Sequence, residues 1–280
     1  MTERKNNMRW SGGEEFRNLT LKDKSNWLSR RRFIASSLAV AVIGPSLMGE
    51  SRRPALRLGL VADVQFADRD AGKTRFYRQS LGKLTEAVEH FNGLDLQCCI
   101  NLGDLIDRGW ESYDEILKPL ARSRHAFHHL LGNHDFEVPD ELKAQVPKRL
   151  GLKRRYYSVP ANEFCLVMLD TTDVSPYAQA ARSRATAEAE AERKRLAATG
   201  AVNAERWNGA VGTRQLKWFD DTCRQAARAG RKVIVFSHHP VYPAGVHCEW
   251  NSEALLKVVA DNRNVVAWIN GHDHAGACGI

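Results

Sequence analysis

Residues that can bind metal ions follow several apolar stretches of this 280-residue chain. The stretch LGLVADVQFAD, residues 58–68, places Asp63 and Gln65 directly after an apolar run. Four later runs end in NLGDLIDRG, LLGNHD, FSHHP and INGHDH, which add aspartate, asparagine and histidine. Any one of these motifs alone is typical of a turn, since Gly, Asn and Asp tolerate turn backbones. Five of them at the ends of apolar runs indicate one shared site.

The chemistry that this set favours is a pair of divalent metal ions about 3.5–4 Å apart, joined by a bridging carboxylate. Asp104, which follows Gly103, is the natural bridge. Neighbouring residues on an extended strand face opposite sides, so only one histidine of SHHP, His238 or His239, can be a primary ligand. The candidate ligands are Asp63, Gln65, Asp104, Asn133, that histidine, His272 and His274.

Beside Asn133 stands a histidine that the ligand set does not need. His134, as an imidazolium, could protonate a leaving oxygen or stabilise negative charge in the transition state, and Asp135 could hold its ring. Asp107 and Arg108 have the simpler interpretation of an ion pair in a turn. His247 has no spacing signal and is expected to be exposed.

The elements that must position these residues alternate between strands and helices. Apolar, β-branched runs predict strands at 56–62, 97–103, 126–131, 164–169, 232–236 and 265–270. Apolar residues at helical spacing predict helices from Tyr77 to Phe91 and from Leu216 to Ala226. This alternation predicts an α/β fold with a buried sheet, whose strand ends form the ligand site. Residues 178–207, rich in Ala, Arg and Glu, predict a solvated helical insertion.

The basic charge of the chain is concentrated before the first strand. The whole chain carries +8, of which residues 1–53 contribute +6, so residues 54–280 have no basic stripe for nucleic acid. SRRRF, followed by a short apolar run, predicts a twin-arginine export signal read by the export machinery. We therefore expect an exported, periplasmic or cell-envelope protein, anchored in the membrane if the signal is not cleaved. We expect no stable protein partner, and residues 54–280 should form the functional domain.

The motifs DVQ, GDLIDRG, GNHD, SHHP and GHDH, in this order, resemble the calcineurin-like metallophosphoesterases. The resemblance implies a four-layer sandwich, with helices flanking two packed mixed β-sheets, whose C-terminal part is expected to be missing here. It selects His238 over His239 and gives His134 the catalytic position. It implies two metal sites that share Asp104: Asp63, Gln65 and His274 complete one, and Asn133, His238 and His272 the other.

Within that superfamily, DVQFAD and TRFYRQSL resemble the manganese-dependent ADP-ribose/CDP-alcohol diphosphatases. The resemblance implies metal-dependent cleavage of the pyrophosphate bond in a small nucleotide substrate. Oxygen donors without a thiolate favour Mn²⁺, with Mg²⁺, Co²⁺, iron or Zn²⁺ as alternatives. Rival hypotheses are a phosphomonoesterase, a cyclic-nucleotide phosphodiesterase and an inactive metal-binding scaffold. The predicted substrate contacts are Phe66, Arg108, Trp250 and Asn251.

Overall fold

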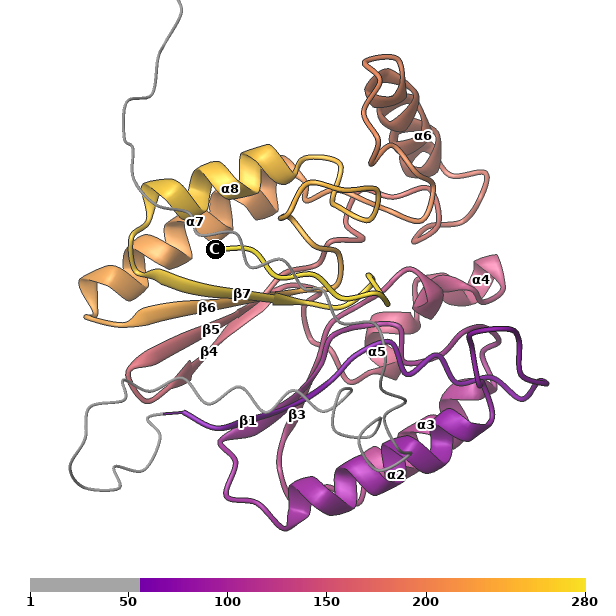
Figure 1. Ribbon diagram of the computed structural model, residues 1–280. Coiled ribbons are helices and arrows are strands. Elements are labelled where there is room, and N and C mark those ends of the chain that lie inside the picture. Colours follow the sequence, from indigo (N-terminus) through magenta and orange to yellow (C-terminus); the bar gives the residue numbers. More distant parts are fainter. Residues whose placement is uncertain (1–55) are drawn as a thin grey trace, which may run out of the picture.

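The computed structural model describes residues 56–280, so the predicted signal in residues 1–53 lies outside the described part. Two β-sheets pack face to face, and helices cover their outer faces (Figure 1). The predicted four-layer α/β arrangement is therefore confirmed.

The first sheet contains three parallel strands, each followed by polar residues of the site. Val61 pairs with Asn101, so the segments that follow these two strands leave the sheet at the same edge. Helices α2 (Gln79–Asn92) and α3 (Ser112–Leu120) cover the outer face (Figure 1). The strands are, in sheet order, β1 (Leu58–Val61), β2 (Cys98–Asn101) and β3 (Phe127–His129).

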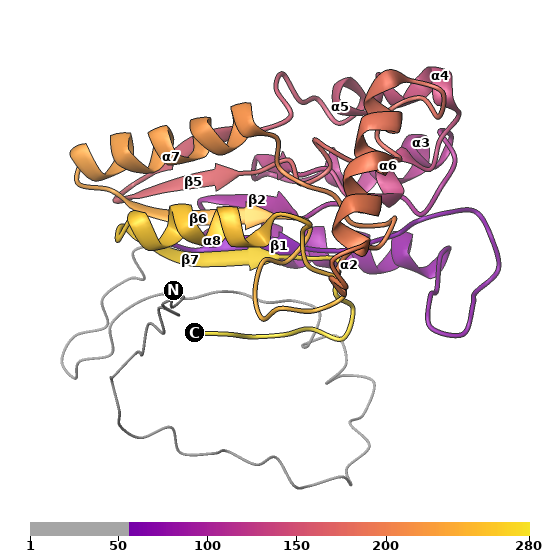
Figure 2. The ribbon, with the colours of Figure 1, turned by 90° about the horizontal axis from the view of Figure 1, so that it is seen from above.

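The second sheet has four strands and is mixed. Its first pair is antiparallel, and the other pairs are parallel. The first strand was not predicted from the sequence; it forms a tight hairpin with the second through Asn162, whose φ is positive. Helices α7 (Thr213–Arg228) and α8 (Ser252–Asp261) lie along this sheet (Figure 2). The strands are β4 (Tyr157–Ala161), β5 (Phe164–Met168), β6 (Lys232–Ser237) and β7 (Val265–Asn270).

Alternation along the central strands explains the layers. In β6, Ile234 and Phe236 join the core between the sheets, while Val233 and Val235 join the core under α7 and α8. In β2, Ile100 faces the other sheet. Both faces of these strands are buried, so their sequences read as continuous apolar runs.

The remaining helices are short or peripheral. Helix α6 (Arg184–Ala197) lies within the predicted insertion, begins at the N-cap Ser183 and is tied to the domain through the buried Ala189. The other elements are the 3₁₀ turn η1 (His134–Phe136), α4 (Asp140–Lys143) and α5 (Val146–Arg149).

Candidate metal centre

The candidate ligands meet where the strands of both sheets end, and four of them have unusual backbone angles. Asp63, Gln65, Asp104 and His272 have φ of 51°, 48°, 53° and 69°. Such left-handed conformations cost roughly 1–3 kcal/mol each in residues other than glycine and cluster at functional sites. Two backbone hydrogen bonds hold the first turn, from Asp63 N to Gly103 O (3.3 Å) and from Gln65 N to Asp104 O (2.9 Å).

Asp104 lies at the centre of the cluster, and a glycine makes room for its side chain. A Cβ atom on Gly132 would lie 2.2 Å from Asp104 Oδ1, and one on Gly103 would lie 2.6 Å from Nδ1 of His238. Neither position can accept a larger residue without displacing a candidate ligand. The glycines of GD and GN are therefore required by close packing, and Gly103 also by its φ of 98°.

On one side of Asp104 stand Asp63, Gln65 and His274. Gln65 Nε2 lies 3.2 Å from Asp104 Oδ2 and 3.3 Å from His274 Nε2, and His274 Nε2 lies 3.5 Å from Asp63 Oδ1. The side chains of Asp63 and Gln65 converge because both residues have left-handed backbones, not because the segment is an extended strand. If the Gln65 amide is rotated by 180° about its terminal bond, its oxygen instead of its nitrogen faces Asp104 and His274, where it can act as a metal ligand.

On the other side stand Asn133, His238 and His272. His238 Nε2 lies 3.4 Å from Asp104 Oδ2, 3.2 Å from Asn133 Oδ1 and 3.2 Å from His272 Nδ1. Its Nδ1 faces the carbonyl of Leu102 at 2.9 Å, and His272 Nε2 faces Oδ1 of Asn208 at 3.0 Å.

These outer partners fix the direction of the lone pairs. Leu102 O and Asn208 Oδ1 accept, so Nδ1 of His238 and Nε2 of His272 donate to them. The remaining nitrogens then direct their lone pairs at each other across 3.2 Å. Two facing lone pairs at this distance repel unless a proton or a metal ion lies between them. The donor set therefore fits a metal ion, and Asp63, Asp104 and His238 each offer a ligand atom within 4.8 Å of the others.

The pKa values of His238 and Asp104 show the same preference for a positive charge between them, whereas His272 stays neutral. Burial lowers the pKa of His238, but the neighbouring Asp104 more than reverses this, so the pKa is raised to about 9. Burial opposes ionisation of Asp104 as well, yet His238 holds its pKa well below the usual range. His272 has a lowered pKa because of burial and the neighbouring imidazoles, so it stays a neutral nitrogen donor.

His134 lies beside the cluster and is held by Asp107. Its backbone N–H donates to Asp104 Oδ1 (2.8 Å), and its Nδ1 lies 3.1 Å from Asp107 O and 3.6 Å from Asp107 Oδ1. Its Nε2 faces Nη1 of Arg75 at 3.2 Å, and the same Nη1 donates to Asp107 at 3.1 Å. Arg75 was missed from the sequence, because a lone arginine in a loop carries no spacing signal.

Asp135 does not hold the ring of His134, and this expectation was wrong. Its carboxylate is fully buried and accepts hydrogen bonds from the backbone N–H groups of Asp104 (3.0 Å), Leu105 (3.0 Å) and Gly132 (2.9 Å). The hydroxyl of Tyr113 also donates to it at 3.2 Å. Asp135 therefore joins the loops after β2 and β3, which places Asp104 and Asn133. Asp107 forms the expected ion pair with Arg108, and it also positions the ring of His134.

Two further histidines pack against the cluster. Both ring nitrogens of His239 have partners, Thr171 Oγ1 at 2.8 Å and Trp207 O at 3.0 Å, so no lone pair remains for a metal. His247 is half-buried, and its ring centroid lies 5.3 Å from that of His272. The expectation that His247 is exposed was therefore wrong.

Three of the predicted substrate contacts are structural. Phe66 is 4 % exposed, because its bridge to Ile106 turns it into the core beside α2 and α3. Trp250 is also buried, and its indole N–H donates to the carbonyl of Glu205 at 3.1 Å. The Asn251 side chain exchanges two hydrogen bonds with the backbone of Val211.

Arg108 differs from these three residues, because its side chain remains 56 % exposed and binds Asp107 at 2.7 Å. Its contact with substrate stays a prediction.

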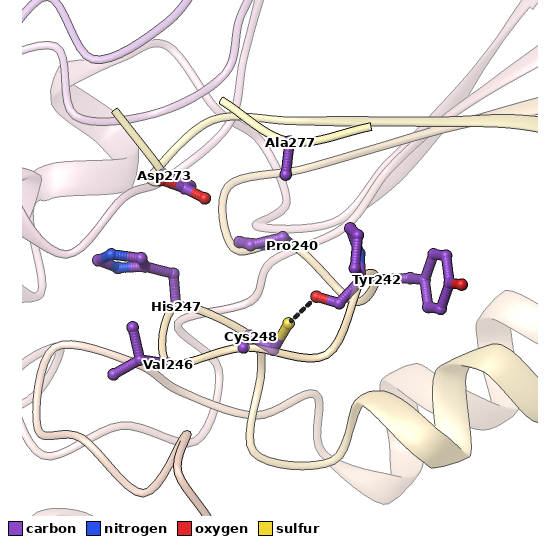
Figure 3. Close-up of a pocket in the computed structure, with 9 residues that line it drawn as sticks. Pro240, Tyr242, Val246, His247, Cys248, Asp273 and Ala277 are labelled. Carbon is purple, nitrogen blue, oxygen red and sulfur yellow. Dashed lines mark hydrogen bonds between the residues drawn. The ribbon is translucent and has the colours of Figure 1, made fainter. Parts of the chain in front are cut away.

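A cavity of about 160 Å³ adjoins the histidine side of the cluster. Figure 3 shows His247, Cys248 and Asp273 around it, with the Cys248 thiol donating to the carbonyl of Pro243 at 3.1 Å. Both SHHP and GHDH lead into its wall, so it opens next to the candidate ligands. The lining residues are Pro240, Tyr242, Pro243, Gly245, Val246, His247, Cys248, Asp273 and Ala277.

Comparisons with known proteins agree with this geometry. The family model for calcineurin-like phosphoesterases matches residues 56–276. A manganese-dependent ADP-ribose/CDP-alcohol diphosphatase of Arabidopsis thaliana is 30% identical over 81% of this chain and 82% of its own length. A protein of the same name from Danio rerio is 29% identical over 80% and 83%. The crystal structure of a dimetal phosphatase from Danio rerio has a TM-score of 0.70 at 26% identity, covering 81% of this chain and 85% of that one.

Proposed function

Because the chain belongs to the calcineurin-like phosphoesterase family, we propose that it is a dinuclear phosphohydrolase for nucleoside diphosphate derivatives. Its substrates are of the kind named for its relatives, ADP-ribose and CDP-alcohols, and the bond cleaved is P–O–P. The observation that carries the proposal is the convergence of six donor side chains, three on each side of Asp104. This is the arrangement that a bridged pair of metal ions requires.

Each ion would take ligands from both sheets. Asp63, Gln65 and His274 would hold one ion and share Asp104 with the other. Asn133, His238 and His272 complete the second set. Divalent ions bound there supply a hydroxide nucleophile at neutral pH and offset the charge of the phosphates. Mn²⁺ suits this mixture of oxygen and imidazole donors.

The chain's own residues then act on the leaving group. His134 Nε2 and the Arg75 guanidinium are 3.2 Å apart, and both can donate to a phosphate oxygen once Nε2 is protonated. Asp107 fixes both groups, because it accepts from Arg75 and contacts His134 Nδ1. A leaving phosphate has a pKa near 6 and needs little protonation, so charge stabilisation is the main contribution of this pair.

The test is turnover by the full-length chain with Mn²⁺ on ADP-ribose, CDP-choline and p-nitrophenyl phosphate. We expect AMP and ribose 5-phosphate from ADP-ribose, and CMP with phosphocholine from CDP-choline, each faster than hydrolysis of the monoester. Preference for the monoester would replace the proposal with a phosphomonoesterase, and faster cleavage of a cyclic nucleotide would indicate a phosphodiesterase. Metal binding without any turnover would favour a scaffold.

We also propose that the N-terminal arginines direct export. SRRRF, residues 29–33, precedes a short apolar run, and such signals are receptor-read addresses. Among residues 56–280, no helix is long and apolar enough to cross a membrane. Replacing Arg30 and Arg31 by lysine should retain the protein inside the cell, as measured by fractionation; unchanged export would contradict the proposal.

A further inference from the structure

Asn208 is a fully buried residue that joins three segments of the chain beside the metal centre. Its Oδ1 lies 3.0 Å from Nε2 of His272, in the turn after β7. Its Nδ2 donates to the carbonyl of Asn203 at 2.9 Å, within the segment between α6 and α7. The same Nδ2 donates to the carbonyl of Val246 at 2.7 Å, in the loop that follows SHHP. Both groups of this amide therefore have partners inside the protein.

The two carbonyl partners allow only one orientation of the Asn208 amide. A carbonyl oxygen can only accept, so the NH₂ group must face Asn203 and Val246, and the amide oxygen must face His272. An amide oxygen in that position accepts from Nε2, which therefore carries the proton of the His272 ring. The Nδ1 atom keeps its lone pair and lies 3.2 Å from Nε2 of His238. Asn208 thus selects Nδ1 as the atom that His272 offers to a metal ion.

Further hydrogen bonds hold the backbone segment that carries Asn208. The side chain of Asn203 donates from Nδ2 to the carbonyl of Glu249 at 2.6 Å. The indole N–H of Trp250 donates to the carbonyl of Glu205 at 3.1 Å. Asn203 and Glu205 belong to the predicted insertion, so the end of that insertion is fixed to the loop after SHHP. The insertion therefore contributes to the order of the metal centre, which its composition did not indicate.

The second histidine of SHHP supports the same segment from the other side. Nε2 of His239 donates to the carbonyl of Trp207 at 3.0 Å, directly before Asn208. Nδ1 of His239 then accepts from the hydroxyl of Thr171 at 2.8 Å, and this hydroxyl oxygen accepts from the His239 backbone N–H at 3.2 Å. His239 cannot bind a metal ion in this state, but it fixes the backbone position from which Asn208 reaches His272.

We propose that Asn208 is a positioning residue for the ion held by Asn133, His238 and His272, a proposal that rests on the metal centre of the function proposed above. Without Asn208, the ring proton of His272 can move to Nδ1, and a protonated Nδ1 cannot bind a cation. Loss of such an outer partner typically costs roughly 10–100-fold in metal affinity. The loss falls on the ligand set that contains His272, and the set that contains His274 is spared.

The first experiment reads the tautomer directly in the full chain. Long-range ¹H–¹⁵N NMR of the chelated protein distinguishes the two ring nitrogens, and His272→Gln assigns the ring signals of His272 by their loss. We expect the proton on Nε2 in the wild type and a mixture of both tautomers in Asn208→Ala. A proton on Nδ1 in the wild type would overturn the proposal, whatever the variants show. The measurement needs neither bound metal nor turnover.

Two variants then separate the acceptor for His272 from the bonds that hold the segment. Asn208→Ala removes the oxygen that accepts from His272 together with both donors. Asn208→Asp keeps an oxygen acceptor and loses only the donors to Asn203 and Val246. Calorimetry with Mn²⁺ should show that the affinity of one of the two sites falls roughly 10–100-fold in Asn208→Ala and stays near the wild-type value in Asn208→Asp. Both variants should have a lower Tm.

Asn262→Ala is the matched control, because Asn262 is also a buried asparagine with two bonds from Nδ2, to Asp220 and to the carbonyl of Val258, both at 2.8 Å. This variant should lower Tm and leave the affinity for both ions unchanged. Equal loss of affinity in the two Asn208 variants, or no loss in Asn208→Ala, would overturn the proposal. If the affinities split as expected but no nucleotide is hydrolysed, only the proposed function fails.

Discussion

The two sheets contribute chemically different halves of the metal centre. The edge of the β1–β3 sheet supplies carboxylates and amides, namely Asp63, Gln65, Asp104 and Asn133, and the edge of β6 and β7 supplies only imidazoles. Three of the four residues from the first sheet have left-handed backbones, and so does His272 in the second half. His238 and His272 are in addition oriented by hydrogen bonds to Leu102 and Asn208. Strained turns thus occur in both halves, whereas ring-nitrogen hydrogen bonds to outer partners orient these two imidazoles. The following predictions test this division.

The largest loss of metal binding and turnover is expected at Asp104, which both ligand sets share. Asp104→Asn should remove both metal ions and reduce turnover by more than the 10–100-fold typical of losing an outer partner. The reason is that a bridging carboxylate serves both ligand sets. Metal content by elemental analysis and turnover of ADP-ribose are the measurements. Asp261→Asn, on the exposed surface of α8, is the control. Two bound ions with near-normal turnover would refute the dinuclear arrangement.

The second prediction concerns His134, which contacts Asp104 through its backbone N–H but is not a candidate metal ligand. His134→Ala should keep both metal ions and slow turnover roughly 10²-fold, at the low end for a general acid–base group. The loss should be larger for an alkyl phosphate monoester than for ADP-ribose, because an alkoxide needs the proton more. His90→Ala, at an exposed position of α2, provides the control. Loss of one metal equivalent would instead make His134 a ligand.

The third prediction uses the charge of the imidazole half. In chelated protein, the pKa of His238 is raised from 6.5 to about 9, and this shift corresponds to about 3 kcal/mol. A raised folded-state pKa stabilises the protein below pH 6.5, and this stabilisation is lost as the pH rises through 9. Urea midpoints of the chelated protein should therefore fall between pH 6.5 and 9. His238→Gln should flatten this slope; an equal slope in both proteins would contradict the assignment.

The smallest effect concerns Gln65, an amide of the oxygen half that lies close to the imidazole of His274. Gln65→His should keep the fold and both metal ions while shifting the metal preference from Mn²⁺ toward Zn²⁺ or iron, because imidazole is the softer donor. Activity of both proteins reconstituted with Mn²⁺, Mg²⁺, Co²⁺ and Zn²⁺ gives the ranking. Identical rankings would show that Gln65 does not contact the metal.

Much of the fold was predictable because its elements carry local signals. Apolar runs and helical periodicity identified six of the seven described strands and the helices α2 and α7, and composition indicated α6, whereas α3 and α8 were not predicted. Strand β4 was missed because Tyr157, Val159 and Ala161 alternate only weakly with polar residues. The strand-end motifs placed the candidate ligands together, since parallel strands end at a common edge.

The misses depend on contacts between distant segments. Asp135 was assigned to His134 by adjacency, but its partners lie in the loop after β2. Trp250 and Trp207 have similar polar neighbours in the sequence. In the folded chain, Trp250 packs against Ala189 of α6 and Ala210 and is buried, whereas Trp207 is 43% exposed. Sequence identifies which residues can do chemistry, and long-range packing decides which of them face the ligand.

The contact between Asp63 and His272 also has a consequence for biosynthesis. Both carboxylate oxygens of Asp63 accept from the backbone N–H of His272, 209 residues later in the chain. A ribosome makes the N-terminal part first, so the oxygen half emerges long before the imidazole half. Closing this loop carries a high entropic cost that an incomplete nascent chain cannot offset. Metal capture should therefore be one of the last events of maturation, which limits binding of a wrong metal by the unfinished polypeptide.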